Sequence, residues 1–193
     1  SRNIKELQKR MKELALHILD IAENSIKADA DNLYIKVLED TNKNILSIKI
    51  KDDGNGIKKD ILENITDPFV TTRKTRPVGL GLSLFKAATE RCNGFFEISS
   101  DNKGTTIEAI FEHDHSDRAP LGDMSQTIIS LLLWENDFEV KYKHIFNNEV
   151  FIFDTKEIKD ELSGTKIHNS TIINWLKEYI NENISNLRGG EYN

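Results

Sequence analysis

The segment at residues 44–57, NILSIKIKDDGNGI, constrains the fold of this chain more than any other. Its first half alternates apolar and polar residues, with Leu46, Ile48 and Ile50 on one side, and this two-residue period predicts a half-buried strand. The strand runs directly into a turn that holds two acids and two glycines. Glycine at the end of a strand is typical of places where a ligand approaches the backbone closely.

A calcium-binding EF-hand loop is the first alternative for this turn. Gly56 could occupy the invariant sixth position, with Asp53 and Asn55 as ligands. Lys51 would then occupy the first position and Leu62 the twelfth, so the bidentate carboxylate is missing. A predicted strand also precedes the turn where an EF-hand needs a helix. We therefore do not expect calcium here.

The composition describes a chain that can bury a core. Of its 193 residues, 38% are hydrophobic, and this length favours one domain, or one domain with a small addition. The formal charge of -6, with both signs interspersed, neither demands nor forbids a partner by itself. It disfavours duplex DNA binding by a broad basic face, and we expect no nucleic-acid partner. No stretch approaches the roughly 18 apolar residues of a membrane span, and no secretory signal is evident. Together with the single Cys92, this predicts a cytoplasmic protein with no membrane partner.

A long helix is expected over residues 13–30, because apolar residues recur there with a helical period. A separate face of this helix carries the polar residues His17, Asp20, Asn24 and Lys27. Buried polar groups cost free energy unless something satisfies them, so this stripe indicates a site. For His17 alone we expect a core histidine that hydrogen-bonds with Asp20, one turn away.

The remaining sequence predicts further helices and strands and one boundary between two segments of the chain. Strands are expected at residues 32–39, 44–51, 94–100 and 105–113, and helices at 58–65 and 80–93, with a loop between these two helices. Beyond a connector near His113 we expect a helix at 124–135, a hairpin of 138–144 with 149–154, and terminal helices. We therefore predict two segments, 1–115 and 116–193, the second a small α/β segment for partner binding or dimerisation. Trp134 and Trp175 lie on helical periods and are expected in the core.

Three of these features fit one ligand. A glycine-rich turn that opens a helix presents free N–H groups and the positive end of the helix dipole to phosphate. An Asn and an acid one helical turn apart can orient Mg²⁺ and water. An Asp beside glycines can accept a hydrogen bond from a ligand that comes close. Together they predict a pocket for Mg²⁺ and a nucleoside triphosphate.

The order of these segments resembles the GHKL ATPases, the superfamily of gyrase, heat-shock chaperone, histidine kinase and mismatch-repair ATPase domains. LHILDIAENSIKA resembles the N box, DDGNGI the G1 box, DPFVTTRK the F box, VGLGLSL the G2 box and KGTTIEAIF the closing segment. The likeness covers about residues 13–112 and is closest to a stand-alone histidine-kinase-like catalytic domain. It implies an α+β Bergerat fold, a two-layer sandwich with a mixed, mostly antiparallel sheet, here followed by a small C-terminal α/β appendage.

The resemblance also implies roles for single residues. Asp20 would orient water or act as general base, Lys27 would reach a phosphate, and Asn24 would hold Mg²⁺. Asp52 would bind the adenine amino group of ATP. The other implied nucleotide-binding residues are Gly54, Gly56, Thr71, Thr72, Arg73, Lys74, Gly79, Leu80, Gly81, Leu82 and Thr105.

This sequence departs from the family pattern in two informative ways. Hydrolysing members commonly carry Glu where Asp20 stands, and this shorter side chain predicts slow turnover. We also expect the dimerising helical hairpin with its phosphoacceptor histidine to be missing, because about a dozen residues before the N box are too few for two long helices.

Several functions remain open from the sequence. The first is a kinase that transfers the γ-phosphate to a His or Ser of an unidentified protein partner. The alternative is an ATP-gated switch or slow ATPase that regulates a partner, as anti-sigma kinases do, with a homodimer possible in either case. Mismatch repair is a third alternative, disfavoured by short length and acidic charge. His113 and His115, beside Asp114 and Asp117, could bind a metal or accept phosphate.

Overall fold

A computed structural model describes residues 12–66, 80–134, 138–162 and 169–189 of the chain. Its centre is a six-stranded sheet in the order β3-β4-β2-β1-β5-β6. The strands are β1 (Asn32–Asp40), β2 (Ile45–Asp52), β3 (Phe95–Asp101), β4 (Gly104–Glu112), β5 (Glu139–Phe146) and β6 (Glu149–Asp154). All neighbours pair antiparallel except β1 and β5, which are parallel. The mixed, mostly antiparallel sheet of the predicted α+β fold is therefore confirmed.

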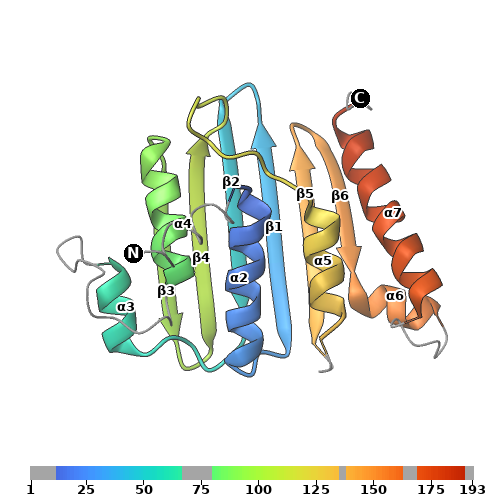
Figure 1. Cartoon of the computed structure of the whole chain (residues 1–193), viewed down its shortest axis with the longest axis horizontal. Coiled ribbons are helices and arrows are strands. Elements are labelled where there is room, and N and C mark those ends of the chain that lie inside the picture. Colours follow the sequence, from blue (N-terminus) through green and yellow to red (C-terminus); the bar gives the residue numbers. More distant parts are fainter. Residues whose placement is uncertain (1–11, 67–79, 135–137, 163–168, 190–193) are drawn as a thin grey trace.

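Four helices form a second layer on one face of this sheet (Figure 1). They are α2 (Leu14–Lys27), α4 (Leu80–Arg91), α5 (Met124–Leu132) and α7 (Ser170–Leu187). Two short helices, α3 (Lys59–Thr66) and α6 (Thr155–Glu161), lie near the ends of the strands. The predicted alternation in the strands appears as alternating burial, because Leu46, Ile48 and Ile50 face the helices and are at most 1% exposed.

The C-terminal segment continues the same sheet. β5 pairs with β1 from Asn32 opposite Glu139 to Glu39 opposite Phe146, and β6 pairs with β5. The apolar side chains of β5, α5 and α7 join those of α2 and β1 in one buried cluster. The predicted boundary after residue 115 lies in the connection between β4 and α5, and the strands on both sides share one core.

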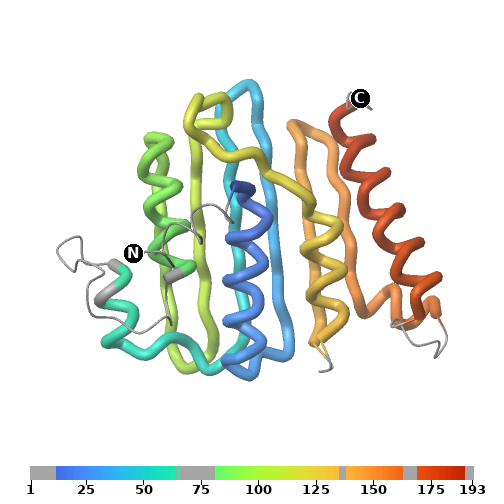
Figure 2. Tube along the Cα trace, viewed as in Figure 1, coloured from blue at the N-terminus to red at the C-terminus, as the bar shows by residue number. Residues whose placement is uncertain are grey.

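The connection from β4 to α5 crosses the helix-covered side of the molecule (Figure 2). On its way it accepts hydrogen bonds from the first turn of α2, because the amides of Leu14 and Ala15 donate to the carbonyls of Pro120 (2.9 Å) and Leu121 (2.7 Å). These amides would otherwise have no partner within the helix. The start of α2 is thereby fixed to the connection between β4 and α5.

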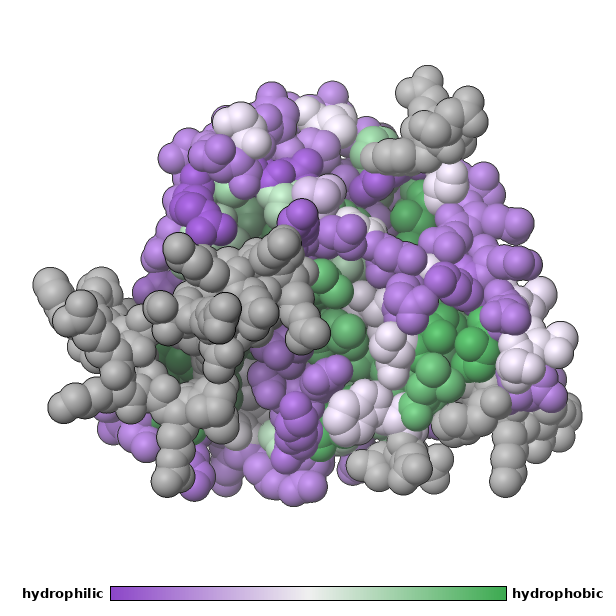
Figure 3. Space-filling view, in the orientation of Figure 1, coloured by the Kyte–Doolittle hydropathy of each residue, from purple (hydrophilic) through white to green (hydrophobic). Residues whose placement is uncertain are grey.

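The helix-covered surface is mostly hydrophilic, with hydrophobic side chains visible between the helices (Figure 3). Trp175, expected in the core, is instead 50% exposed on α7 and stacks on Tyr179 at 5.5 Å between ring centroids. Trp134 is half-buried against the core, as its helical period suggested. In the part of the chain that the structure describes, no helix is both long and apolar enough to cross a bilayer.

Candidate functional site

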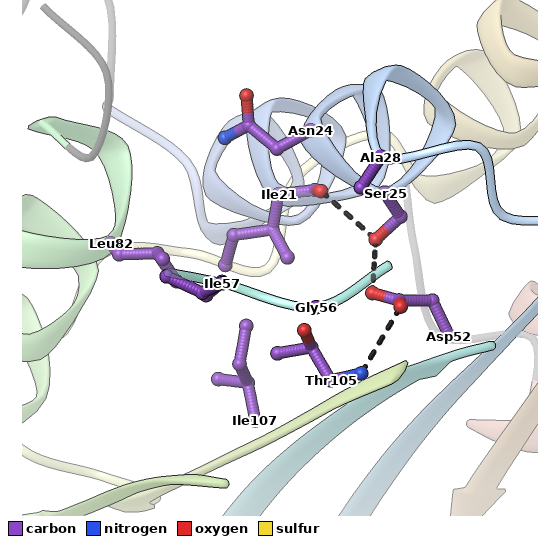
Figure 4. A pocket seen from close by; sticks show the side chains of 10 residues that line it. All are labelled: Ile21, Asn24, Ser25, Ala28, Asp52, Gly56, Ile57, Leu82, Thr105 and Ile107. Atoms are coloured by element: carbon purple, nitrogen blue, oxygen red, sulfur yellow. Dashed lines mark hydrogen bonds between the residues drawn. The ribbon is translucent and has the colours of Figure 1, made fainter. Parts of the chain in front are cut away.

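Asp52, at the end of β2, is the centre of the candidate site. Its side chain is buried, and its Oδ2 accepts a 2.6 Å hydrogen bond from the Ser25 hydroxyl of α2 (Figure 4). Its Oδ1 accepts from the amides of Gly54 (3.0 Å) and Thr105 (3.1 Å). A carboxylate offers about four lone-pair positions, and three donors occupy three of them. One acceptor position therefore remains for a donor on a ligand.

The turn after Asp52 is held tightly between α2 and β3. The Asn55 amide donates to the carbonyl of Ala28 (2.8 Å), and the Ile57 amide donates to the Ser100 hydroxyl (2.7 Å). Gly56 has φ +73°, and a Cβ there would lie 1.9 Å from the carbonyl oxygen of Asp101. Only glycine fits this backbone without a shift of the neighbouring strand.

The calcium alternative does not fit this turn. Asp53, one of the would-be ligands, accepts hydrogen bonds from the amides of Asp31 (2.9 Å) and Asn32 (2.8 Å). The Asn55 side chain donates to Asp29 at 3.0 Å. Among the described residues there is no group of three or more His, Cys, Asp or Glu side chains that could hold a metal ion.

An apolar slot opens beside Asp52 between α2 and the sheet. Its polar edge is formed by Asn24, Ser25, Asp52 and Thr105. The remaining lining comes from Ile21, Ala28, Gly56, Ile57, Leu82 and Ile107. Figure 4 shows these side chains converging from α2, the glycine turn, α4 and β4. A flat, apolar ring with a hydrogen-bond donor on one edge suits such a slot.

The polar stripe of α2 leads from this slot toward the first turn of α4. Asn24 lines the slot, and no other described residue hydrogen-bonds with its side-chain amide. Asp20, one turn earlier, lies against α4, since a Cβ on Gly81 would come within 1.6 Å of its Oδ2. Burial raises the pKa of Asp20, and the charge of Lys27 offsets part of this. Lys27 itself does not line the slot: its ammonium group is exposed and lies 3.8 Å from Glu23.

His17 differs from its predicted environment. Its ring is buried and stacks on Phe85 of α4 at 5.3 Å, and its Nδ1 has no hydrogen-bond partner among the described residues. The expected hydrogen bond with Asp20 is therefore wrong, because packing against an aromatic ring holds His17 in place. Burial, followed by the charge of Arg91, lowers the pKa of His17 to about 4.

The predicted phosphate-binding segment is only partly described. α4 begins at Leu80, and Leu82 is buried in the slot. Gly79 and the lid residues Thr71, Thr72, Arg73 and Lys74 lie outside the described residues. Their predicted roles stay predictions.

His113 and His115 lie far from this site. Glu112 at the end of β4 pairs with Ile45 at the start of β2, whereas Asp52 ends β2. His113 contacts the buried Glu39 at 3.1 Å, and the Nδ1 of His115 accepts from the Asp117 amide at 3.1 Å. These two histidines therefore lie at the opposite end of the sheet from the slot.

Sequence reasoning missed two serines that shape the site. Ser25 is buried among the apolar residues of α2, yet its hydroxyl orients Asp52. Ser100 joins the turn to β4, because its hydroxyl contacts both the Ile57 amide and the Thr105 hydroxyl (2.8 Å). A small polar residue on an otherwise apolar helix stripe was the available signal for Ser25. For Ser100 the sequence carried none.

Comparison with known proteins gives a consistent picture for this part of the chain. The family described as "Histidine kinase-, DNA gyrase B-, and HSP90-like ATPase" matches residues 10–115, more than half of the chain. The sensor kinase CckA of Brucella abortus (strain 2308) is 33% identical over 100 residues, which cover 49% of this chain and 10% of that protein. The histidine-protein kinase ArlS of Staphylococcus haemolyticus (strain JCSC1435) is 32% identical over 101 residues, 49% of this chain and 22% of that kinase. The chain thus matches only a minor part of the length of these relatives.

Among solved structures, the N-terminal domain of a DNA repair protein aligns with 74% of this chain and 52% of its own, at 14% identity and a TM-score of 0.45. The histidine kinase domain of the Erythrobacter litoralis EL346 blue-light activated kinase aligns with 44% of this chain and 37% of its own, at 13% identity and a TM-score of 0.31. The family match itself covers α2, the glycine turn, α4 and β4, which together form the slot. The chain belongs to the histidine kinase-, DNA gyrase B- and HSP90-like ATPases, the GHKL superfamily, and its ATP-binding domain is similar to the catalytic domains of sensor histidine kinases.

Proposed function

We propose that this chain binds Mg²⁺ and ATP between α2, the glycine turn and α4, and transfers the γ-phosphate to a His or Ser of a partner protein. The observation that carries the proposal is the Asp52 carboxylate, held by three donors beside an apolar slot and left with one acceptor position. The exocyclic amino group of adenine is the donor that this position fits. The adenine ring would lie between the apolar side chains of Ile21 and Ile107.

The phosphate end of the nucleotide would meet α2 and α4. The helix of α4 begins beside Asp20, and its first amides would face the phosphates with the positive end of the helix dipole. The Asn24 amide, which no described residue engages, offers the oxygen ligand that Mg²⁺ prefers. When bound, Mg²⁺ would neutralise charge on the phosphates.

Asp20 is the candidate base of this site. Its pKa is raised by burial, which makes its carboxylate a better proton acceptor at neutral pH than an exposed aspartate. Its place against α4 keeps it near the predicted phosphates. Catalysis of phosphoryl transfer consists mainly of such positioning and charge stabilisation. Lys27, exposed beside Glu23, would have to leave that contact to reach a phosphate.

The relatives named as kinases support transfer to a protein, and the position of His113 and His115 argues that the acceptor belongs to another molecule. A chain without a suitable acceptor would instead act as an ATP-gated switch or slow ATPase. Both histidines of the connector lie at the end of the sheet away from the slot, so neither is placed to accept phosphate from ATP bound in its own chain. Self-phosphorylation of these two histidines within one chain is therefore not expected.

Two neighbouring acids give a matched test of the pocket. Asp52→Asn and Asp53→Asn each remove one negative charge from the same turn, but only Asp52 lines the slot. Titration calorimetry with Mg²⁺ and ATP should show at least a 100-fold loss of affinity for Asp52→Asn and wild-type affinity for Asp53→Asn. Tight ATP binding by Asp52→Asn would refute the pocket assignment.

Transfer is tested separately with ATP labelled on the γ-phosphate. Label that moves to an added partner protein, and fails to move with Asp20→Asn, supports the kinase. Label that stays on ATP or appears as free phosphate supports the switch or slow ATPase. Asp20→Asn should still bind adenosine. A variant that binds adenosine but does not transfer phosphate has lost catalysis and kept the nucleotide pocket.

A further inference from the structure

A second hollow lies on the other side of the turn that carries Asp52. The register places Lys51 of β2 beside Tyr34 of β1, and Tyr34 beside Lys141 of β5, so these three side chains share one face of the sheet. It is the uncovered face, because Ile50, the residue before Lys51, is buried under the helices. The hollow has a volume of about 620 Å³, within the range of about 300–1,000 Å³ of small-molecule sites.

Four lysines from separate parts of the chain line this hollow, which we call the lysine groove. They come from β2, from the turn between β3 and β4, from β5 and from the first turn of α6, and are Lys51, Lys103, Lys141 and Lys156. These segments meet at the end of the sheet where β2 ends (Figure 1). The last two lysines lie beyond residues 10–115, which the family model matches. The lysine groove therefore depends on the C-terminal segment.

Two of the acids that line the lysine groove are neutralised within the chain. Asp154 accepts a hydrogen bond from the ammonium group of Lys141 at 3.0 Å. Glu139 accepts one from Lys159 at 2.7 Å, and Lys159 does not line the groove. These acids therefore do not balance the other three lysines.

The acids of the glycine turn are also engaged. Asp53 accepts hydrogen bonds from the amides of Asp31 (2.9 Å) and Asn32 (2.8 Å) and from the side chain of Asn32 (2.7 Å). The carboxylate of Asp52 belongs to the ATP slot, where Ser25 donates to it. Of these two acids, only Asp53 adds a negative charge on the groove side.

The remaining three lysines have no acidic partner. The ammonium groups of Lys51 and Lys103 form no ion pair or hydrogen bond with any residue that the structure describes. Lys156 donates to the side-chain oxygen of Asn32 at 3.1 Å, which is a neutral partner. The hydroxyl group of Tyr34 also has no hydrogen-bond partner in the described part of the chain. The lysine groove thus offers free donors, whereas its acceptors are engaged.

A ligand that carries only acceptors and several negative charges fits this set of donors. Linked phosphates have both properties, and each ammonium group can contact a different phosphate oxygen. With about 4.8 Å between strands, the four intervals from β4 to β6 span about 19 Å. Lys103 and Lys156 lie near the two ends of this span and can extend toward each other along its surface. An extended anion therefore suits the groove better than a single phosphate.

We propose that the lysine groove binds an oligophosphate, an anion of two or more linked phosphates that is either inorganic or the phosphate chain of a nucleotide. The proposal does not rest on the proposed function, because the groove lies on the uncovered face of the sheet and the ATP slot lies under the helices. It accounts for lysines without acidic partners at one end of an acidic chain.

Titration calorimetry with inorganic tripolyphosphate, in the absence of Mg²⁺, tests this proposal. Lys51→Gln and Lys103→Gln should each lower the affinity at least tenfold. Lys36→Gln and Lys143→Gln are the matched controls, because they remove the same charge from the same face but do not line the groove. These controls should change the affinity less than twofold. Urea unfolding shows that each variant is folded.

Three results would overturn the proposal. The first is a wild-type chain that does not bind tripolyphosphate. The second is an equal loss of affinity in all four variants, which would show diffuse attraction to a basic surface. The third is binding that neither Lys51→Gln nor Lys103→Gln weakens, since tripolyphosphate would then occupy the phosphate end of the ATP slot. Failure of the ATP slot itself is seen separately, in the titration of Asp52→Asn with Mg²⁺ and ATP.

GTP distinguishes the two sources of phosphate. In the ATP slot, the carbonyl oxygen of guanine would face the carboxylate of Asp52, so GTP should not bind there. Tighter binding of GTP than of tripolyphosphate, with the same dependence on Lys51 and Lys103, would assign the groove to a nucleotide. Equal or weaker binding would assign it to inorganic oligophosphate. Tighter binding of a hexaglutamate peptide than of either phosphate would contradict the proposal.

Discussion

The Ser25 hydroxyl on α2 donates a 2.6 Å hydrogen bond to Oδ2 of Asp52 at the end of β2. This contact joins the helix layer to the sheet at the candidate adenine site, and it fixes which oxygen of Asp52 is left to face the slot. Hydrogen bonds to charged groups contribute about 1.5–3 kcal/mol. The orientation of the carboxylate therefore depends on a residue that does not itself have to touch the nucleotide.

We expect Ser25→Ala to weaken ATP binding about tenfold, since Asp52 would keep its two amide donors but lose the one from α2. Calorimetric titration with Mg²⁺ and ATP measures this. Ser99→Ala, an exposed serine of β3 outside the slot, is the matched control and should bind as the wild type does. Wild-type affinity in Ser25→Ala would mean that the amides of Gly54 and Thr105 suffice.

Gly81→Ala should weaken binding of the phosphate end of the nucleotide and leave binding of the adenine end unchanged. The new Cβ would lie 1.6 Å from Oδ2 of Asp20 and 2.7 Å from its Cγ, so the carboxylate must rotate away. The adenine end, around Asp52, is not touched by this change. We expect ATP affinity to fall at least tenfold and adenosine affinity to stay at the wild-type value. Equal losses for both ligands would show that α4 itself had moved.

The periodic parts of the fold could be predicted from sequence. The alternation of Leu46, Ile48 and Ile50 predicted β2 and its buried face, and the helical period of residues 13–30 predicted α2. Both signals come from one face that must be buried, so a window of the sequence contains them completely. The turn after β2 was predicted from its own residue types, whereas the roles of Asp52, Gly54 and Gly56 were implied by the family resemblance.

The pairing of distant segments could not be predicted in this way. β5 lies parallel to β1, about a hundred residues earlier, and no local period encodes that neighbour. The stacking of His17 on Phe85 also depends on how α2 meets α4. Trp175 follows a helical period but lies on the exposed side of α7, because Leu176 and Ile180 are the residues that face the core. Contacts between elements decide these cases.

The buried His17 predicts a loss of stability in mild acid. Burial, with the charge of Arg91, lowers its pKa from 6.5 to about 4 in the folded state. Between pH 6.5 and 4 His17 is therefore protonated in the unfolded chain but neutral in the folded chain. The folded state has its full stability above pH 6.5 and loses stability as the pH falls toward 4. A shift of this size corresponds to about 3 kcal/mol.

His17→Leu, of similar volume, removes this titration and keeps an apolar contact with Phe85. Urea unfolding of the wild type and the variant at pH 7, 5.5 and 4 should give a difference in free energy of unfolding that shifts in favour of the variant by about 3 kcal/mol across this range. A constant difference at all three pH values would show that His17 is solvated in the folded chain.

Glu39 predicts a second acid-sensitive contribution, at lower pH and at the other end of the sheet. This buried carboxylate of β1 accepts hydrogen bonds from His144 of β5 (2.8 Å) and from Arg188 at the end of α7. Burial raises the pKa of Glu39, but the hydrogen bonds and charges of these two partners lower it by more than burial raises it. The net result is a pKa of about 2. The stability that they contribute is present above the unfolded value of 4.5 and is lost as the pH falls toward 2.

Glu39→Gln should therefore remove about 3 kcal/mol of stability at pH 7 and flatten the decline between pH 4.5 and 2, because the amide no longer titrates. Guanidinium unfolding at pH 7, 4.5 and 3 measures both effects. Glu149→Gln, an exposed carboxylate on β6, is the matched control and should keep the wild-type stability at pH 7. Glu39→Gln could instead lose stability at pH 7 but keep the wild-type decline in acid. The protonation of other carboxylates would then account for acid unfolding, and the contacts of Glu39 with His144 and Arg188 would only hold the end of α7 on the sheet.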